Sequence, residues 1–336
     1  MTDYVDPNDP EVLRILAQES DAVRAKDLQL NTEIVAKSAL DLRKQIESLW
    51  DAGLPPGERT GWPSVDKHYT VAPGQLTVVT GWPGSGKSEW VDALVLNLCV
   101  AGWRFAVFSP ENMPPEIHAV KFLEKYSGKP FGDGPTERMS KDEAIKAAKS
   151  IEEWIGFLLP IDATDRLTFG VEEILAAAEA RFRAIDAWHD TYCKKGLVID
   201  PWNELEHLRP KQMMETEYIS LTLTKVRGWA RKHRIHVWIV AHPQKLKREE
   251  GKLPIPTPDS ISGSQNWWNK ADCAITIWRD LAQGDSTVKI YVQKVRFKHI
   301  GRSGVVDLEY DKVTGQYKDA YISVVSTPNF DKRHRV

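Results

Sequence analysis

Gly-Trp-Pro-Gly-Ser-Gly-Lys-Ser, at residues 81–88, is the stretch that decides the fold of this chain. It is a complete G-x-x-x-x-G-K-[ST] phosphate-binding loop, and it lies between an apolar, strand-like run at 76–80 and a helical stretch at 89–100. That context predicts a P-loop protein that binds a nucleoside triphosphate, because backbone N–H groups and the start of a helix together attract phosphate. The loop residues expected to surround the phosphates are Gly81, Gly84, Ser85 and Gly86.

The end of the loop and a later strand predict how Mg²⁺ and the phosphates are held. Lys87 is expected to bridge the β- and γ-phosphates, and the Ser88 hydroxyl is expected to ligate Mg²⁺. A second Mg²⁺ ligand is predicted at Asp200, which ends the most apolar strand candidate, Leu197-Val198-Ile199-Asp200. The alternative is that Asp200 only caps the following turn, where aspartate is common.

Composition restricts the other function classes. The chain has 336 residues, of which 42% are hydrophobic and 27% charged, and its formal net charge is −2, as in ordinary globular proteins. We expect no membrane partner and a cytoplasmic location, because no apolar run could cross a bilayer and residues 1–11 resemble neither a signal nor a transit peptide. The small net charge means that a nucleic-acid partner has to be argued from local charge.

The pattern along the chain predicts three zones. Residues 11–50 are polar and helical, and residues 53–63 are rich in Gly and Pro, which predicts a hinge. Beyond the hinge, short apolar runs alternate with helical patterns, which predicts an α/β fold with a mainly parallel central sheet. The zones are a helical region at 1–52, one large domain at 53–325 and a basic tail at 326–336 that we expect to be disordered. The apolar stripe of the first zone consists of Leu30, Ile34, Ser38, Leu42, Ile46 and Leu49.

Strand candidates define the expected sheet. Its parallel part is predicted from residues 76–80, 105–109, 157–161, 197–200 and 237–241. Three later runs, 274–278, 289–295 and 305–310, are separated by short turns and are expected to form an antiparallel meander at one edge. Glu111 follows the candidate at 105–109, at the sheet edge where open α/β folds bind ligands. From position alone, a general base and an ordinary surface glutamate are equally good interpretations.

An ordered series of motifs goes further than the P-loop. Thr60-Gly61-Trp62-Pro63-Ser64-Val65-Asp66 and Pro73-Gly74-Gln75-Leu76 precede the loop, and Ser109-Pro110-Glu111-Asn112-Met113 follows it. With these motifs, residues 60–316 resemble the motor domain of DnaB-like hexameric replicative helicases, and most closely the helicase halves of phage primase-helicases and Twinkle. Those proteins are RecA-fold ATPases, so the resemblance implies a RecA-like core. It also implies that Glu111 polarises the lytic water and that Asp200 holds Mg²⁺.

Five further residues have roles only through this resemblance. His242 follows the strand candidate at 237–241 and matches a γ-phosphate sensor, although a lone histidine beside a strand is more often structural. Arg279 and Tyr310 match two groups that sandwich the nucleotide base, which implies loose specificity among NTPs. Arg296, with Lys294 as helper, matches an arginine finger that reaches the nucleotide of the adjacent subunit. A ring, of six subunits in this family, is therefore implied, and the apolar stripe matches the linker helix that docks on the neighbour.

The resemblance also supplies a DNA-binding segment at 245–252. It matches the central-channel loop that grips single-stranded DNA, and its cations suit phosphates better than base edges, which implies binding without sequence preference. Glu249 and Glu250 keep a solvated charged loop as the alternative. The cations are Lys245, Lys247, Arg248 and Lys252.

Together these features imply an ATP- and Mg²⁺-dependent DNA helicase of a bacterial or phage-infected cell, working on single-stranded and forked DNA as a homo-oligomeric ring. A primase, polymerase or loader is the expected protein partner. The segment before residue 60 is too short for a primase domain and no zinc-ligand spacing occurs, so we expect no priming activity. Two alternatives stay open: a RecA-type recombinase that forms filaments, and a regulatory ATPase, such as a helicase loader, that uses nucleotide as a switch.

Overall fold

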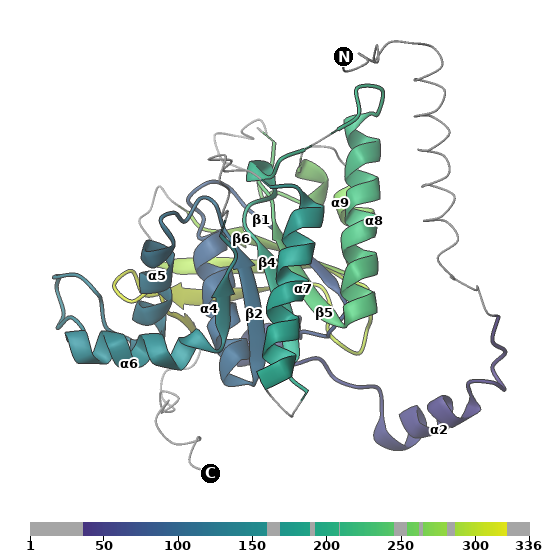
Figure 1. Ribbon diagram of the computed structural model, residues 1–336, viewed down its shortest axis with the longest axis horizontal. Helices are drawn as coiled ribbons and strands as arrows, with labels where there is room; N and C mark the ends of the chain where they lie inside the picture. Colours follow the sequence, from purple (N-terminus) through teal and green to yellow (C-terminus); the bar gives the residue numbers. More distant parts are fainter. Residues whose placement is uncertain are drawn as a thin grey trace, which may run out of the picture. The chain divides into compact units, whose positions relative to one another are not determined.

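The computed structural model describes residues 36–159, 169–188, 192–207, 209–244, 254–261, 265–280 and 286–320 (Figure 1). The chain divides between Pro55 and Pro56 into two compact units, and each is described by itself. Within the described ranges, no helix combines the length and the apolar character that crossing a membrane would require.

The described part of the first unit contains helix α2 (Arg43–Ala52), in which no residue is buried. Its apolar stripe is open to solvent: Leu42, Ile46 and Leu49 are 37%, 51% and 44% exposed. Positions 30 and 34 of the predicted stripe lie outside the described residues. An amphipathic helix gains most of its stability from packing its apolar face, so this face is suited to a partner surface.

The second unit is built on a nine-stranded sheet with the order β3-β2-β4-β5-β1-β6-β7-β8-β9. Neighbouring strands from β3 to β6 run parallel, and β7, β8 and β9 continue the sheet as an antiparallel meander. The structure thus confirms the predicted α/β class and the meander at one edge. The strands are β1 (Leu76–Thr80), β2 (Trp103–Phe108), β3 (Ile155–Phe157), β4 (Lys194–Ile199), β5 (Ile235–Val240), β6 (Cys273–Trp278), β7 (Thr287–Val295), β8 (Gly304–Tyr310) and β9 (Tyr317–Asp319).

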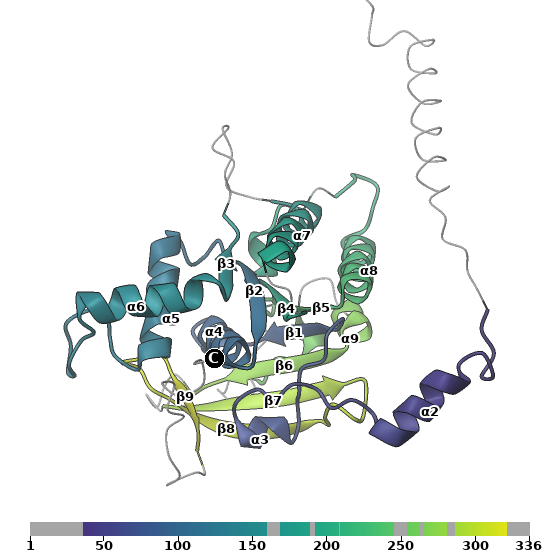
Figure 2. The same ribbon diagram turned by 60° about the horizontal axis from the view of Figure 1, so that its bottom comes forward.

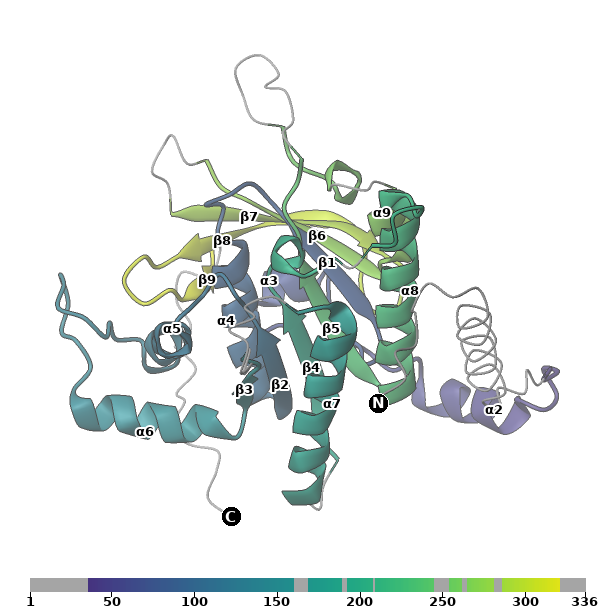
Figure 3. The ribbon, with the colours of Figure 1, turned by 45° about the horizontal axis from the view of Figure 1, so that its top comes forward.

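Helices cover both faces of the parallel strands, because successive strand residues point to opposite faces and both sets are apolar. Val79, for example, packs with α4 (Lys87–Val100), α5 (Pro115–Ser127) and α6 (Lys141–Glu152) in one core. Its neighbour Val78 packs with α7 (Val171–Trp188) and α8 (Glu215–His233) in a second core. Figure 2 shows α7 and α8 on one side of the sheet, and Figure 3 shows α5 and α6 beside α4. Two short helices, α3 (Pro63–Asp66) and α9 (Asn266–Lys270), complete the α-helices of the described residues.

Two details of the predicted strands are wrong. The candidate at 157–161 is shifted, because the strand already begins at Ile155, which pairs with Phe105 of β2. Strand β9 was not predicted at all, since three residues carry too little periodicity; its pairing of Tyr317 with Tyr310 fixes it to the edge of β8.

Candidate nucleotide-binding site

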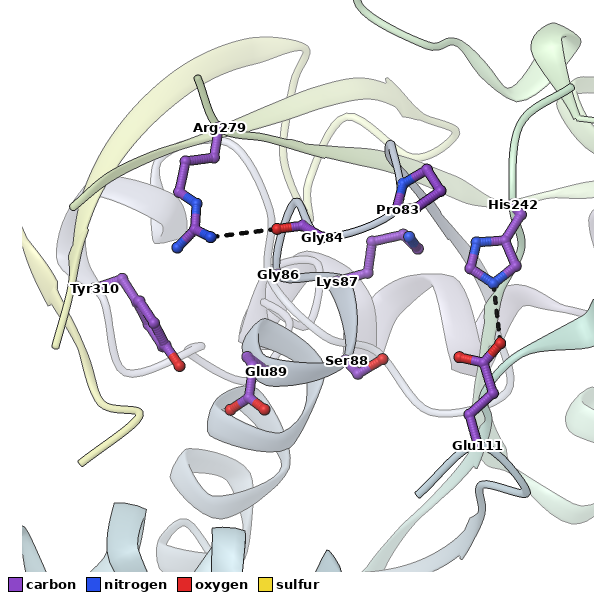
Figure 4. Close-up of a pocket in the computed structure, with 10 residues that line it drawn as sticks. All are labelled: Pro83, Gly84, Gly86, Lys87, Ser88, Glu89, Glu111, His242, Arg279 and Tyr310. Atoms are coloured by element: carbon purple, nitrogen blue, oxygen red, sulfur yellow. Dashed lines mark hydrogen bonds and ion pairs between the residues drawn. The ribbon is translucent and has the colours of Figure 1, made fainter. Parts of the chain in front are cut away.

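A cavity of about 540 Å³ opens beside the P-loop, at the edge where the parallel strands end. The segments that follow β1, β2, β5 and β6 converge there (Figure 4). The lining residues are Pro83, Gly84, Gly86, Lys87, Ser88, Glu89, Glu111, His242, Arg279 and Tyr310. The cavity therefore gathers most of the predicted nucleotide-binding residues, from the P-loop to the end of β8, into one site.

All three P-loop glycines have a positive φ, and two of them also lie too close to neighbouring atoms for a side chain. Gly86 ends the loop with φ +93°, and a Cβ there would lie 3.0 Å from the hydroxyl of Tyr317. Gly81 has φ +153°, and its Cβ would lie 2.2 Å from the carbonyl oxygen of Ile277. Because the first amides of α4 have no helical acceptor, they remain available to an anion at this end of the cavity. Gly81 and Ser85 are buried and support the loop without lining the cavity.

Lys87 is the buried cation of the site. It is 5% exposed, and its ammonium donates a hydrogen bond to the carbonyl oxygen of Trp82 at 3.2 Å. Burial lowers the pKa of Lys87, while the nearby carboxylates of Asp200 and Glu111 act in the opposite direction. An ammonium has three donors, so this hydrogen bond leaves capacity for phosphate oxygens.

Asp200 and Ser88 form an oxygen pair that fits Mg²⁺. Asp200 follows β4, is 4% exposed, and accepts a hydrogen bond from the Ser88 hydroxyl. Burial, helped by the charges of Asp92 and Glu111, raises the pKa of Asp200 to about 6 against the opposing effect of Ser88. A buried carboxylate with this little compensation favours a hard divalent cation, for which carboxylate and hydroxyl oxygens are suitable ligands.

Glu111 and His242 contact each other at the phosphate end of the cavity. His242 Nε2 lies 3.3 Å from Glu111 Oε1 (Figure 4), and the His242 backbone N–H donates to Asn203 Oδ1 at 2.8 Å. Nδ1 of His242 is buried and has no hydrogen-bond partner among the described residues. The two residues were predicted separately, and their direct contact was not anticipated. It places a carboxylate and a phosphate-sensing candidate within reach of one ligand.

Arg279 and Tyr310 bound the other end of the cavity. The guanidinium carbon of Arg279 lies 5.8 Å from the centre of the Tyr310 ring, and Arg279 Nη2 donates to the Gly84 carbonyl at 3.3 Å (Figure 4). Burial raises the pKa of Tyr310 to about 12, so the phenol stays neutral and its ring can face a cation or a base. The two groups form a cation–π contact, and each has a planar face suited to stacking on a base.

Lys294 and Arg296 lie away from this cavity. The pairing of Cys273 with Val295 puts the end of β7 beside the start of β6. This is the end of the parallel strands opposite to the P-loop. Arg296 is anchored there: its Nε lies 2.9 Å from Asp272 Oδ1, and its Nη2 donates to the Asn269 and Ala271 carbonyls. Lys294 donates to the Trp268 carbonyl. Neither cation therefore serves the cavity of its own chain.

Sequence reasoning missed two carboxylates. Asp272 is 1% exposed and holds Arg227 at 2.8 Å as well as Arg296; its position directly before an apolar strand was the available signal. Glu89 lines the cavity and pairs with Lys121 at 3.1 Å; it directly follows Ser88 at the start of a helix. The four cations predicted to contact DNA, Lys245, Lys247, Arg248 and Lys252, lie outside the described residues.

Comparison with known proteins agrees with this fold. No protein-family model matches the chain. The chain is 38% identical over 300 residues to the Twinkle homolog protein, chloroplastic/mitochondrial, of Arabidopsis thaliana; the match covers 87% of this chain and 40% of that protein. The chain therefore spans well under half the length of this relative.

Two solved structures share the fold at 15% sequence identity. The first, an ATPase domain, superposes with a TM-score of 0.69, covering 85% of this chain and 99% of that one. The second, a DnaB-like replicative helicase described with its interactions with primase, superposes with a TM-score of 0.67, covering 92% of this chain and 72% of that one. At this identity the superpositions speak for the fold alone.

Proposed function

We propose, from the premise that this chain carries a DnaB-like helicase domain with a RecA-like fold, that it is an ATP-driven motor that translocates on single-stranded DNA and unwinds duplex DNA. The observation that carries the proposal is the cavity beside the P-loop. It brings a buried lysine, the Ser88 hydroxyl, a carboxylate and an aromatic–arginine pair to one nucleotide-sized space, and Asp200 lies within hydrogen-bond reach of Ser88. A regulatory switch needs only the binding groups, whereas hydrolysis also needs Glu111.

Each residue has a role that follows from its place. Lys87 would contact the β- and γ-phosphates, and Ser88 and Asp200 would hold Mg²⁺, which neutralises charge on the phosphates when it is bound. Glu111 would orient and deprotonate the attacking water. The His242 contact supports a proposal for control: a γ-phosphate would offer His242 Nε2 a second partner, which would free Glu111 Oε1 for the water.

Two features support a ring, which we expect to have six subunits. Arg296 lies at the edge opposite its own cavity, so a role in catalysis requires the cavity of another subunit. The exposed apolar stripe of α2 supplies a surface that a neighbouring copy would cover. In this arrangement hydrolysis depends on assembly.

The segment proposed to contact DNA is close in sequence to His242, which lines the cavity. Segment 245–252, with its four cations, starts three residues after His242 and would grip the phosphate backbone without reading bases. Single-stranded and forked DNA are the proposed substrates, and a primase, polymerase or loader is the proposed protein partner. The Arabidopsis relative is described as chloroplastic or mitochondrial, so a cytoplasmic location for this chain stays a prediction.

The proposal is tested by ATP hydrolysis with and without single-stranded DNA, together with electron microscopy of the assembled protein. We expect DNA to raise turnover at least several-fold and closed rings to form. Open filaments that pair strands would favour a recombinase. Very slow turnover that DNA does not change would favour a nucleotide-controlled regulatory protein and would contradict the motor.

A further inference from the structure

Trp82 occupies a variable position of the P-loop motif and makes a contact that phosphate binding does not require. Its indole Nε1 donates a hydrogen bond to the carbonyl oxygen of Pro254 at 2.8 Å. Pro254 is the first described residue after the segment proposed to grip DNA. The P-loop therefore touches the chain where it returns from that segment.

We propose that Trp82 is a positioning residue that couples the phosphates of the bound nucleotide to the DNA-binding segment. The inference rests on the proposed function and assigns the coupling to a specific hydrogen bond. It adds a second connection to the one through His242, at the other end of the same segment.

On the nucleotide side, Trp82 is linked to Lys87, the residue proposed to contact the β- and γ-phosphates. Its carbonyl oxygen accepts hydrogen bonds from Lys87 Nζ at 3.2 Å and from the Ser85 backbone N–H at 3.0 Å. Phosphate oxygens are stronger acceptors for an ammonium than a neutral carbonyl is. When phosphates take over Lys87, the Trp82 carbonyl loses one of these two donors, so its position responds to the nucleotide.

On the DNA side, the chain is stiff and anchored just beyond the contact. The Pro256 carbonyl accepts hydrogen bonds from Thr276 Oγ1 at 2.8 Å and from Gln293 Nε2 at 3.0 Å, which fixes it to β6 and β7. Prolines at 254 and 256 restrict the backbone φ. The short stretch between them therefore has little freedom to rotate when Pro254 is displaced. The Trp82 hydrogen bond thereby fixes the chain at Pro254, between the DNA-binding segment and the anchor at Pro256.

The two ends of the segment are also tied to each other. The Gln244 backbone N–H donates to the Ser260 carbonyl at 2.7 Å, and Pro243 and Ile261 form an isolated antiparallel bridge. The chain before the segment and the chain after it are therefore held side by side. In the proposal, His242 acts on the first of these flanks and Trp82 on the second. A signal from the phosphates reaches both ends.

The test is thermodynamic linkage in the full chain. The dissociation constant for a fluorescent oligo(dT) is measured with and without Mg²⁺ and a non-hydrolysable ATP analogue, and the ratio is the coupling factor. Trp82→Phe removes the indole N–H and keeps a ring. We expect it to lower the coupling factor by about threefold or more, the value of one hydrogen bond. Trp154→Phe is the matched control, because that half-buried tryptophan packs on Tyr126 away from the P-loop.

A coupling factor in Trp82→Phe equal to that of wild type would overturn the inference and leave the proposed function standing. Absence of any DNA binding by the wild type would overturn both. Hydrogen exchange of the wild-type amides of Ile255, Thr257, Asp259, Ser260 and Ile261 gives a readout that does not depend on a variant. Their exchange should change when the analogue binds, and unchanged exchange would overturn the coupling.

Discussion

Two buried aspartates at opposite ends of the parallel strands differ in how their charge is compensated. Asp200, at the P-loop edge, is 4% exposed and has the Ser88 hydroxyl as a hydrogen-bond donor, and its pKa is raised by burial to about 6. Asp272, at the other end of the strands, is 1% exposed but lies against three arginines, Arg227, Arg231 and Arg296, and accepts a hydrogen bond from the Leu76 backbone N–H.

The two aspartates differ in how far neighbouring groups offset the cost of burying their charge. A buried carboxylate destabilises a fold unless cations or hydrogen-bond donors offset its lost hydration. Asp272 is offset by its own chain and thereby fastens α8 to the start of β6. Asp200 is offset in part only, and a bound cation would complete it. A buried carboxylate with a raised pKa beside a cavity-lining residue, as Asp200 is beside Ser88, is therefore the better marker of a functional site.

The largest expected effect concerns the cation at each edge. Lys87→Ala should lower kcat for ATP by about 10²–10³-fold, and Arg296→Ala by about 10³-fold or more. If the Arg296 edge of one subunit completes the Lys87 site of the next, mixing the two inactive variants should recover part of the activity. Lys129→Ala is the control, because Lys129 pairs with the surface residues Glu137 and Glu143. Failure of every mixture to recover would contradict shared sites.

The next effect is on stability at the compensated edge. Asp272→Asn leaves Arg227 and Arg296 facing a neutral group and should lower the free energy of unfolding by about 3–5 kcal/mol. Urea unfolding monitored by circular dichroism measures the change. Asp307→Asn, which breaks a partly exposed pair with Lys289 at 2.9 Å, should cost about 1 kcal/mol or less. Equal losses in the two variants would remove the distinction drawn for Asp272.

A smaller effect of opposite sign is expected at the other aspartate. The folded pKa of Asp200 lies above the unfolded value, so the folded state binds more protons between about pH 4 and pH 6, and its stability falls as pH rises through that range. Without Mg²⁺ at pH 7.5, Asp200→Asn should raise the free energy of unfolding by about 1–3 kcal/mol. This gain in stability should disappear near pH 4. The same variant should lose ATP hydrolysis, because Asp200 is proposed to hold Mg²⁺. Destabilisation at pH 7.5 would show that Asp200 is compensated like Asp272.

The smallest effect concerns the base end of the cavity, where stacking replaces charge. Tyr310→Ala should raise KM about three- to tenfold for each of the four NTPs, since an aromatic face and a guanidinium hold any base. Tyr310→Phe, which keeps the ring, should match wild type. A KM that rises for one nucleotide alone would indicate hydrogen-bonded base recognition in place of stacking.

The same comparison explains how far the sequence could be interpreted. The P-loop is contiguous, and Glu111, Asp200 and His242 each follow an apolar strand, so a parallel sheet brings them to one edge. The place of these residues at one end of the parallel strands could therefore be predicted from strand ends, whereas the roles of Glu111 and His242 were predicted from the family resemblance. Contacts between residues that are far apart in the sequence could not be predicted, because they leave no local pattern. Examples are Asp272 with Arg227, Glu111 with His242, and the Trp82 indole with Pro254. The start of β3 was misplaced for the same reason, because pairing with Phe105 decides it.

The central claim, that this chain converts ATP hydrolysis into unwinding, is tested most directly by strand displacement. A forked DNA duplex with one labelled strand is incubated with the protein and Mg·ATP, with the Lys87→Ala variant in parallel. We predict release of the labelled strand by the wild type and none by the variant or without ATP. A wild-type protein that hydrolyses ATP faster on single-stranded DNA yet releases no strand from the fork would contradict the claim.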